Sequence, residues 1–233
     1  MSNSLQVTEG IISRVIPFRE NDQIITIFSP DAGLIKVIYK KKRNLKAGLE
    51  RLCAPLSRVE VVYSERQGEI FNCSEMTCIE TFPNLRKDLL FLEAACDMLQ
   101  VVSLSQMPGK EAKQLYALLL FFLKKIPQSL YPWTLAASFR LKLLKHDGLM
   151  YFPMTCLECG LFLEEEAYTQ ECECFCSLHK PENGLVWNQE ELLHLNQLAL
   201  LQNFSELSSI QLDEQLFNRI RALFAAGIEL ERL

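Results

Sequence analysis

The chain has 233 residues, and its 24 lysines and arginines against 29 aspartates and glutamates give a formal charge of −5. Hydrophobic residues make up 49% and charged residues 23%, which is ordinary for a globular protein and excludes a wholly disordered chain. The longest apolar run covers residues 115–123, well short of the roughly 20 residues that a membrane-spanning helix requires. We therefore expect one or two folded domains and no membrane span, with any nucleic-acid binding confined to a local basic patch.

The first 80 residues carry the pattern of short β-strands. Leu5, Val7, Ile11 and Val15 recur with a period of two. Residues 29–33 and 64–68 have the composition of turns, and 47–52 could form a short helix between the third and fourth strands. The further β-rich runs lie at 24–28, 35–39, 59–63 and 70–79. Five strands in so short a segment favour a closed barrel of the oligonucleotide-binding type, although a small sandwich fits almost as well.

After residue 82 the apolar period changes from two to about 3.6, which predicts helices. Pro132 suits a first helical turn, Asn188 with Glu191 looks like an N-cap, and Asp213 opens a last helix that Gly227 would end. We therefore expect an α+β fold in which an all-β domain precedes an all-α one. The barrel would cover residues 1–82 and bind nucleic acid. The helical domain would cover residues 83–233, with a cysteine-rich insertion at about 151–185.

Five of the nine cysteines lie between residues 156 and 176, in a chain whose start shows no secretory signal. This clustering favours a metal site over a disulfide framework. Two short knuckles can wrap one tetrahedral ion, and thiolate and imidazole ligands favour zinc. We favour a structural zinc site held by Cys156, Cys159, Cys176 and His179. Two further cysteines compete for the four places and stay open as alternatives, namely Cys172 and Cys174.

A basic cluster begins in the third expected strand and continues into the following loop. Arg14 and Arg19 could add to the same surface. In an oligonucleotide-binding barrel this region meets the nucleic acid, where cations bind phosphates without sequence preference. Tyr39, Tyr63 and Phe71 could stack on bases, although strand aromatics are more often core, and the cluster could instead be a solvated loop. Its six cations, with no acidic residue among them, are Lys36, Lys40, Lys41, Lys42, Arg43 and Lys46.

No segment predicts catalysis. A phosphate-binding Gly-x4-Gly-Lys-Ser/Thr loop and a Gly-x-Ser-x-Gly elbow are both missing from the sequence. The cysteine-rich segment lacks the His-x-Glu element of zinc deaminases. A metal with four protein ligands has no open position for water, so it would stabilise the fold rather than act in a reaction. We expect the protein not to be an enzyme.

Three segments resemble the RecO family of DNA-repair and recombination-mediator proteins. Residues 9–14 (Glu-Gly-Ile-Ile-Ser-Arg), 20–29 and Gly33 are similar to the N-terminal barrel of that family. The lysine-rich stretch takes the place of the family's basic segment, but without its usual glycine. Residues 139–144 (Phe-Arg-Leu-Lys-Leu-Leu), followed by the Cys-x2-Cys-Gly of 156–160, resemble the helix that leads into the family's zinc knuckle. His179 stands where the family has a cysteine.

The resemblance implies a mediator of DNA repair and homologous recombination in the bacterial cytoplasm, associated with the nucleoid. Such a protein binds single- and double-stranded DNA and anneals complementary strands. It works with RecR and the single-stranded-DNA-binding protein (SSB), and helps to load the recombinase onto SSB-coated strands. A partner's acidic tail could dock on the helical domain beside Arg140, Lys142 or Lys145. The alternative is a protein-interaction scaffold with a structural zinc site and incidental DNA contact.

Overall fold

The computed structural model describes residues 5–20, 22–40, 54–64 and 68–230. The chain divides into two compact units, Met1–Lys124 and Lys125–Leu233. The first unit therefore contains the barrel together with the helices that follow it, and extends beyond the domain boundary expected at residue 82. Within the described residues, the structure contains no helix of the length and apolarity needed to cross a membrane.

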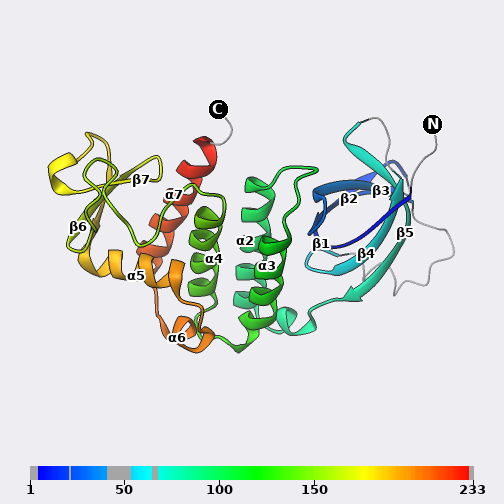
Figure 1. Ribbon diagram of the computed structural model, residues 1–233. Coiled ribbons are helices and arrows are strands. Elements are labelled where there is room, and N and C mark those ends of the chain that lie inside the picture. The colour runs from blue at the N-terminus through cyan, green and yellow to red at the C-terminus, as the bar shows by residue number, and fades with distance from the viewer. Residues whose placement is uncertain (1–4, 21, 41–53, 65–67, 231–233) are drawn as a thin grey trace. The chain divides into compact units, whose positions relative to one another are not determined.

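Five strands form a closed barrel in the order β1-β2-β3-β5-β4 (Figure 1). Only β3 and β5 pair in parallel; the other neighbours are antiparallel. This confirms the oligonucleotide-binding type of barrel and excludes the sandwich. The expected short helix at 47–52 lies outside the described residues. The strands are β1 (Leu5–Phe18), β2 (Asp22–Ser29), β3 (Gly33–Lys40), β4 (Arg58–Ser64) and β5 (Ile70–Glu80).

A β-bulge in β1 decides which side chains enter the barrel. The register with β2 shifts between Ile12 and Arg14, so Ser13 is an extra residue in this strand. Ile12 lies inside and is fully buried, and Val15 packs against the same core. Because the bulge changes the alternation, Arg14 faces outward although it lies two positions after an inward residue. The remaining buried members of this core are Ile25, Ile27, Ile35, Val37, Val59, Val61 and Tyr63.

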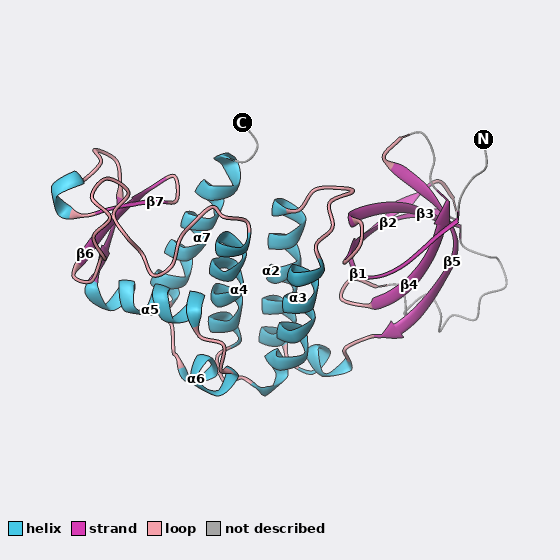
Figure 2. Ribbon diagram, in the orientation of Figure 1, coloured by secondary structure: helices cyan, strands magenta, loops and turns pink. Residues whose placement is uncertain are grey.

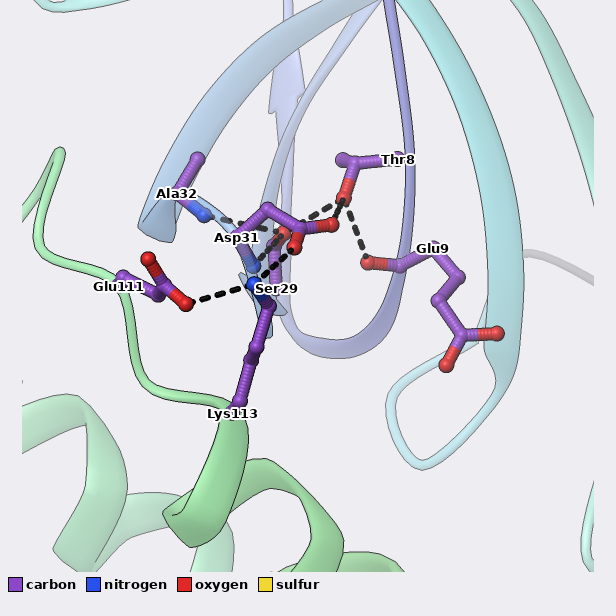
Figure 3. A network of polar contacts seen from close by, with 7 residues as sticks. All are labelled: Thr8, Glu9, Ser29, Asp31, Ala32, Glu111 and Lys113. Atoms are coloured by element: carbon purple, nitrogen blue, oxygen red, sulfur yellow. Dashed lines mark hydrogen bonds and ion pairs between the residues drawn. The ribbon is translucent and has the colours of Figure 1, made fainter.

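The β2–β3 turn is held by a polar network around Ser29 (Figure 3). The hydroxyls of Ser29 and Thr8 lie 2.7 Å apart, and the Thr8 hydroxyl also donates to Asp31 Oδ2 at 3.3 Å. The Lys113 ammonium lies 3.7 Å from Asp31 and 2.6 Å from Glu111. These contacts join the turn to the segment that opens α3, and they confirm the hairpin expected at 29–33.

In the part of the first unit that the structure describes, three helical segments follow the barrel: η1 (Pro83–Lys87), α2 (Leu89–Ser105) and α3 (Lys113–Lys125). The Asp88 side chain caps α2 by accepting from the Leu90 N–H at 2.8 Å. Helix α3 packs against the outer wall of the barrel, where the ring of Tyr116 lies 5.9 Å from that of Phe28. The outward face of β2 is therefore buried at Phe28 and half-exposed further along the strand, at Thr26 and Ile24.

The second unit contains four α-helices and a small sheet with the order β7-β6-β8 (Figure 2). The N-cap expected before α5 is confirmed, because Asn188 and Glu191 form a reciprocal capping box. The sheet begins within the cysteine-rich insertion expected at about 151–185 and ends at Asn188. The elements are η2 (Ile126–Gln128), α4 (Pro132–His146), β6 (Glu166–Gln170), β7 (Glu173–Phe175), η3 (Ser177–His179), β8 (Leu185–Asn188), α5 (Gln189–Leu200), α6 (Phe204–Ser209) and α7 (Glu214–Leu230).

The prediction that the last helix ends at Gly227 is wrong, because α7 continues to Leu230. Gly227 instead allows a close packing contact. A Cβ at this position would lie 2.6 Å from Cys172 Sγ and 3.1 Å from Leu144 Cδ2. The glycine is therefore explained by what packs on the helix rather than by helix termination.

Replacing Gly33 by alanine is expected to destabilise the first unit. Its φ is +60°, and an added Cβ would lie 2.5 Å from the Met107 carbonyl oxygen and 2.6 Å from that of Lys110. Left-handed backbone costs an L-residue about 1 kcal/mol, and displacing two backbone segments adds to this cost. We expect urea denaturation to show a loss of about 2 to 3 kcal/mol in the free energy of unfolding.

Gly109→Ala is the matched control, because Gly109 has a φ of +76° but no atom within 4 Å of the added Cβ. This variant carries the backbone strain without the crowding, so its loss should be about 1 kcal/mol. Equal losses in the two variants would show that the packing of the turn against residues 107–110 is not important.

Candidate nucleic-acid interface and metal centre

The outward side chains of β1, β2 and β3 form three rows across the barrel surface. Paired residues on neighbouring strands point to the same side of a sheet, so the register defines these rows. Val15, Ile25 and Val37 form an inward row that belongs to the core. The outward rows are Arg14–Thr26–Lys36, Ile16–Ile24–Ile38 and Phe18–Asp22–Lys40. An apolar row therefore lies between two rows that carry cations, and we call this surface the β1–β3 face.

Two cations on the β1–β3 face have acidic neighbours. Lys36 Nζ lies 3.6 Å from Glu69 Oε2, with the two side chains 45% and 82% exposed. Lys40 is paired across the strands with Asp22, while Arg14 is exposed. Ion pairs this exposed contribute about 0 to 1 kcal/mol, so a phosphate group can replace the carboxylate. Four cations named from the sequence lie outside the described residues: Lys41, Lys42, Arg43 and Lys46.

The suggestion that Tyr63 stacks on bases is wrong, and Tyr39 and Phe71 are partly buried against the barrel core. Tyr63 is 4% exposed and belongs to the core, and the ring of Phe71 stacks on it at 5.4 Å. Tyr39 packs against the same core. Phe18, which the sequence reading missed, does face outward and lies 5.0 Å from the Arg19 guanidinium. Its direction could be found only by recognising the bulge at Ser13.

Four metal-ligand atoms converge in the cysteine-rich segment. Cys156, Cys159, Cys176 and His179 place one ligand atom each within 4.8 Å of the others. His179 Nδ1 lies 3.5 Å from Cys156 Sγ and 3.3 Å from Cys176 Sγ, and the sulfurs of Cys159 and Cys176 lie 3.9 Å apart. A tetrahedral ion with bonds of about 2.3 Å to sulfur and about 2.0 Å to nitrogen separates its ligands by roughly 3.5 to 3.8 Å. The cluster could therefore hold a metal ion.

Short backbone turns bring these ligands together. The Cys156 N–H donates to the Leu161 carbonyl and the Gly160 N–H to the Cys156 carbonyl, both at 2.8 Å. Gly160 adopts a φ of +70°, which is the left-handed conformation that a knuckle turn needs. In the second knuckle the His179 N–H donates to the Cys176 carbonyl at 3.1 Å. Each knuckle therefore presents two ligands from four consecutive residues.

The surroundings of the cluster favour the thiolate form at two of its three cysteines. Burial opposes ionisation of Cys156, but backbone N–H groups of Cys159 and Cys176 donate to its sulfur and lower its pKa to about 6. Burial likewise opposes ionisation of Cys176, yet the backbone N–H groups of His179 and Leu178 lower its pKa. Hydrogen bonds to Cys156 and Cys176 raise the pKa of His179. The backbone N–H of Leu161 favours ionisation of Cys159, but burial and the neighbouring sulfurs of Cys156 and Cys176 raise its pKa. Thiolate and neutral imidazole are the forms that bind a metal, so metal binding would release protons from this cluster.

Cys172 and Cys174, which also competed as ligands, lie outside this cluster. The Cys172 thiol donates to the Leu223 carbonyl of α7 at 3.4 Å. Both side chains are buried, and burial raises the pKa of Cys172 to about 11 and that of Cys174 to about 12. These two cysteines act as small core residues beneath the knuckles.

The suggested docking of an acidic tail beside Arg140 or Lys142 does not agree with the structure. Arg140 is 4% exposed, and its guanidinium lies 5.3 Å from the ring centroid of Phe217. The Lys142 ammonium donates to the carbonyls of Ala199 and Leu201 at 3.2 and 2.7 Å, so it caps the C-terminal end of α5. Burial lowers the pKa of Lys142 to about 8. Both side chains support the helical unit.

The fold and its clusters define a protein with an oligonucleotide-binding barrel, a helical second domain and a Cys3His cluster of metal-ligand geometry. Two family models match the chain: "Recombination protein O N terminal" at residues 1–82 and "Recombination protein O C terminal" at residues 86–230. The chain therefore belongs to the RecO family of DNA repair proteins.

Curated relatives of similar length support this assignment. A DNA repair protein RecO of Chlamydia muridarum is 26% identical over 222 residues, which cover 94% of each chain. That of Chlamydia trachomatis serovar D is 27% identical over 225 residues, covering 95% of this chain and 92% of the relative. That of Acetivibrio thermocellus is 27% identical and covers 91% and 86% of the two chains. The expected family, DNA repair and recombination are therefore confirmed.

Thiol alkylation should separate the two groups of cysteines. Iodoacetamide reacts with accessible thiolates, whereas Cys172 and Cys174 are buried and have raised pKa values that keep them protonated at pH 8. After treatment with a chelator, we expect Cys159 and Cys176 to be alkylated much faster than the buried pair, as measured by peptide mass spectrometry. In guanidinium chloride all four should react alike. Fast alkylation of Cys174 together with Cys176 in the folded protein would favour a different ligand set.

Proposed function

We propose that this protein is a non-enzymatic recombination mediator that binds single- and double-stranded DNA through the β1–β3 face and anneals complementary strands. The observation that carries the proposal is the register that aligns Arg14 with Lys36 and leaves both on the outward surface of the barrel. Membership of the RecO family supports the same reading. The barrel is the nucleic-acid-binding domain in this proposal, and the helical domain carries the metal site.

Annealing needs charge screening rather than bond chemistry. Two DNA strands repel each other through their phosphates, and cations that bind phosphates release counterions and lower this repulsion. Base pairing then supplies the driving force. The row Ile16–Ile24–Ile38 lies between the cationic rows, where it can contact the sugars and base faces of a strand whose phosphates lie on either side. Neither step requires a catalytic side chain.

The partners of this activity follow from the family resemblance. The protein would act with RecR and SSB to place the recombinase on SSB-coated single strands, in the bacterial cytoplasm at the nucleoid. Burial of Arg140 and the capping role of Lys142 mean that an SSB tail would need a different part of the helical domain. Lys145 remains exposed at the end of α4.

Zinc is the ion we propose for the Cys3His cluster. Three thiolates and one imidazole suit zinc, and the sulfur and nitrogen separations agree with tetrahedral coordination at zinc distances. All four positions would be filled by Cys156, Cys159, Cys176 and His179, so the ion would stabilise residues 151–185. The bound ion would cross-link the two knuckles.

Charge reversal on the β1–β3 face should weaken DNA binding without sequence preference. For the double variant Arg14→Glu with Lys36→Glu, we expect weaker binding to single-stranded DNA and slower annealing. The slope of log affinity against log salt should flatten by about 0.7 for each lost phosphate contact. Glu69→Gln should act in the opposite direction, because it removes the carboxylate that competes with phosphate for Lys36. Fluorescence anisotropy over a salt series measures both effects.

A double variant with the same change in net charge is the control. Lys87 and Lys110 are exposed cations of the first unit that lie outside the β1–β3 face. Lys87→Glu with Lys110→Glu should leave the salt slope close to that of the wild type. If this control weakened binding as much as the variant on the face, the effect would come from net charge and the proposed interface would be wrong.

Metal analysis should find about one zinc per chain in protein purified without chelators. Cys159→Ser should lower this content, whereas Cys174→Ala should keep it, because only the first residue lies in the cluster. His179→Cys should also retain zinc, since it exchanges one suitable ligand for another. Chelator treatment should speed amide hydrogen exchange within residues 151–185. Zinc-free protein with a fully protected segment would refute the site.

A further inference from the structure

The cysteine-rich lobe at residues 151–185 leaves several large apolar side chains in solvent. The sheet that crosses this lobe buries Ala167 completely, together with Trp187 just beyond the lobe. A group of neighbouring exposed apolar side chains on a folded element is typical of a docking surface. Four such side chains are Leu157 (57% exposed), Leu161 (61%), Phe162 (66%) and Leu178 (85%).

These four side chains belong to one end of the lobe. Leu157 lies between Cys156 and Cys159, and Leu178 lies directly before His179. Because the ligand atoms of both knuckles lie within 4.8 Å of one another, the two leucines flank the same cluster. Phe162 and the adjoining Leu161 close the first knuckle, since Phe162 forms a β-bridge with Thr155. We call Leu157, Leu161, Phe162 and Leu178 the knuckle tip.

The charge around the knuckle tip is strongly negative. Residues 151–185 contain seven glutamates and no aspartate or arginine, and their one lysine is Lys180. The Lys180 ammonium lies 4.9 Å from the ring centroid of Tyr168, on the lobe itself. Glu158, Glu164 and Glu165 are exposed; Glu158 directly follows Leu157, and the other two lie two and three residues after Phe162. Phosphates would be repelled from this surface, whereas lysine and arginine side chains would be attracted to it.

We propose that the knuckle tip docks a basic, amphipathic segment of a partner protein. Apolar side chains of that segment would cover Phe162 and Leu178, while its cations would meet the flanking glutamates. Charge complementarity selects this occupant over nucleic acid, and the apolar centre with a charged rim is the usual anatomy of a protein interface. The proposal uses different residues from the β1–β3 face and does not rest on the DNA-binding activity.

The test measures binding of a synthetic amphipathic helix built only from leucine and lysine. Fluorescence anisotropy of the labelled peptide with the full-length, metal-loaded protein should show saturable binding that weakens as salt increases. The double variant Phe162→Ser with Leu178→Ser should bind at least about tenfold more weakly. Exchanging Glu158, Glu164 and Glu165 for glutamine should also weaken binding and reduce its salt dependence. A peptide with glutamate in place of lysine should bind at least about tenfold more weakly than the lysine peptide.

Matched variants elsewhere in the second unit distinguish binding at this surface from non-specific peptide binding. Leu130 is 86% exposed, so Leu130→Ser removes an apolar group of similar exposure to Leu178. Glu229→Gln removes an exposed glutamate from α7. Both should leave peptide affinity unchanged, and metal content with far-UV circular dichroism should show that every variant is folded.

Three outcomes would overturn the proposal. The first is peptide binding that survives the Phe162 and Leu178 changes or weakens equally with the Leu130 control. The second is preferential cross-linking of single-stranded DNA to Phe162. The third is concentration-dependent self-association that the same double variant abolishes, because the occupant would then be a second copy of this chain. Failure of DNA binding by the barrel would affect none of these measurements.

Discussion

The extra residue in β1 is the constraint on which the barrel surface depends. Side chains of a regular strand point alternately to the two faces of the sheet. The bulge at Ser13 interrupts this alternation in β1. Before the bulge, the outward residue Ile11 is fully buried, and its cross-strand partner Phe28 packs under α3. After the bulge, the outward positions begin with Arg14. One inserted residue thus divides a single strand into a part that supports a helix and a part that presents a cation.

The sequence predicted the type and order of the elements better than it predicted their faces. The five β-rich runs, the turn at 29–33 and the capping box at Asn188 all depend on neighbours within a few residues, and the structure confirms them. The period-two pattern of Leu5 and Val7 correctly indicates a strand, yet these residues are 63% and 62% exposed. Which side of a strand enters the barrel depends on pairing with distant strands, and a local pattern does not contain that information.

The same distinction explains the two clusters. The knuckle spacing predicted four ligands, because residues three apart in a tight turn are close in any fold. The structure brings those four together. Other features depend on segments that lie far apart in the sequence. Examples are the pairing of Lys36 with Glu69, the inward direction of Tyr63 and the packing role of Gly227. Such contacts could be found only from the folded structure.

The contact between Cys172 and Gly227 limits how the second unit can vary. The β6–β7 turn, in which Glu171 and Cys172 both have positive φ, places the Cys172 sulfur directly over α7. Since no side chain fits beneath that sulfur, a homologue with a side chain at position 227 should carry a residue smaller than cysteine at position 172. The Cys172 thiol also donates to the Leu223 carbonyl of α7, so a hydrogen bond and a packing contact together attach the β6–β7 turn to the C-terminal helix.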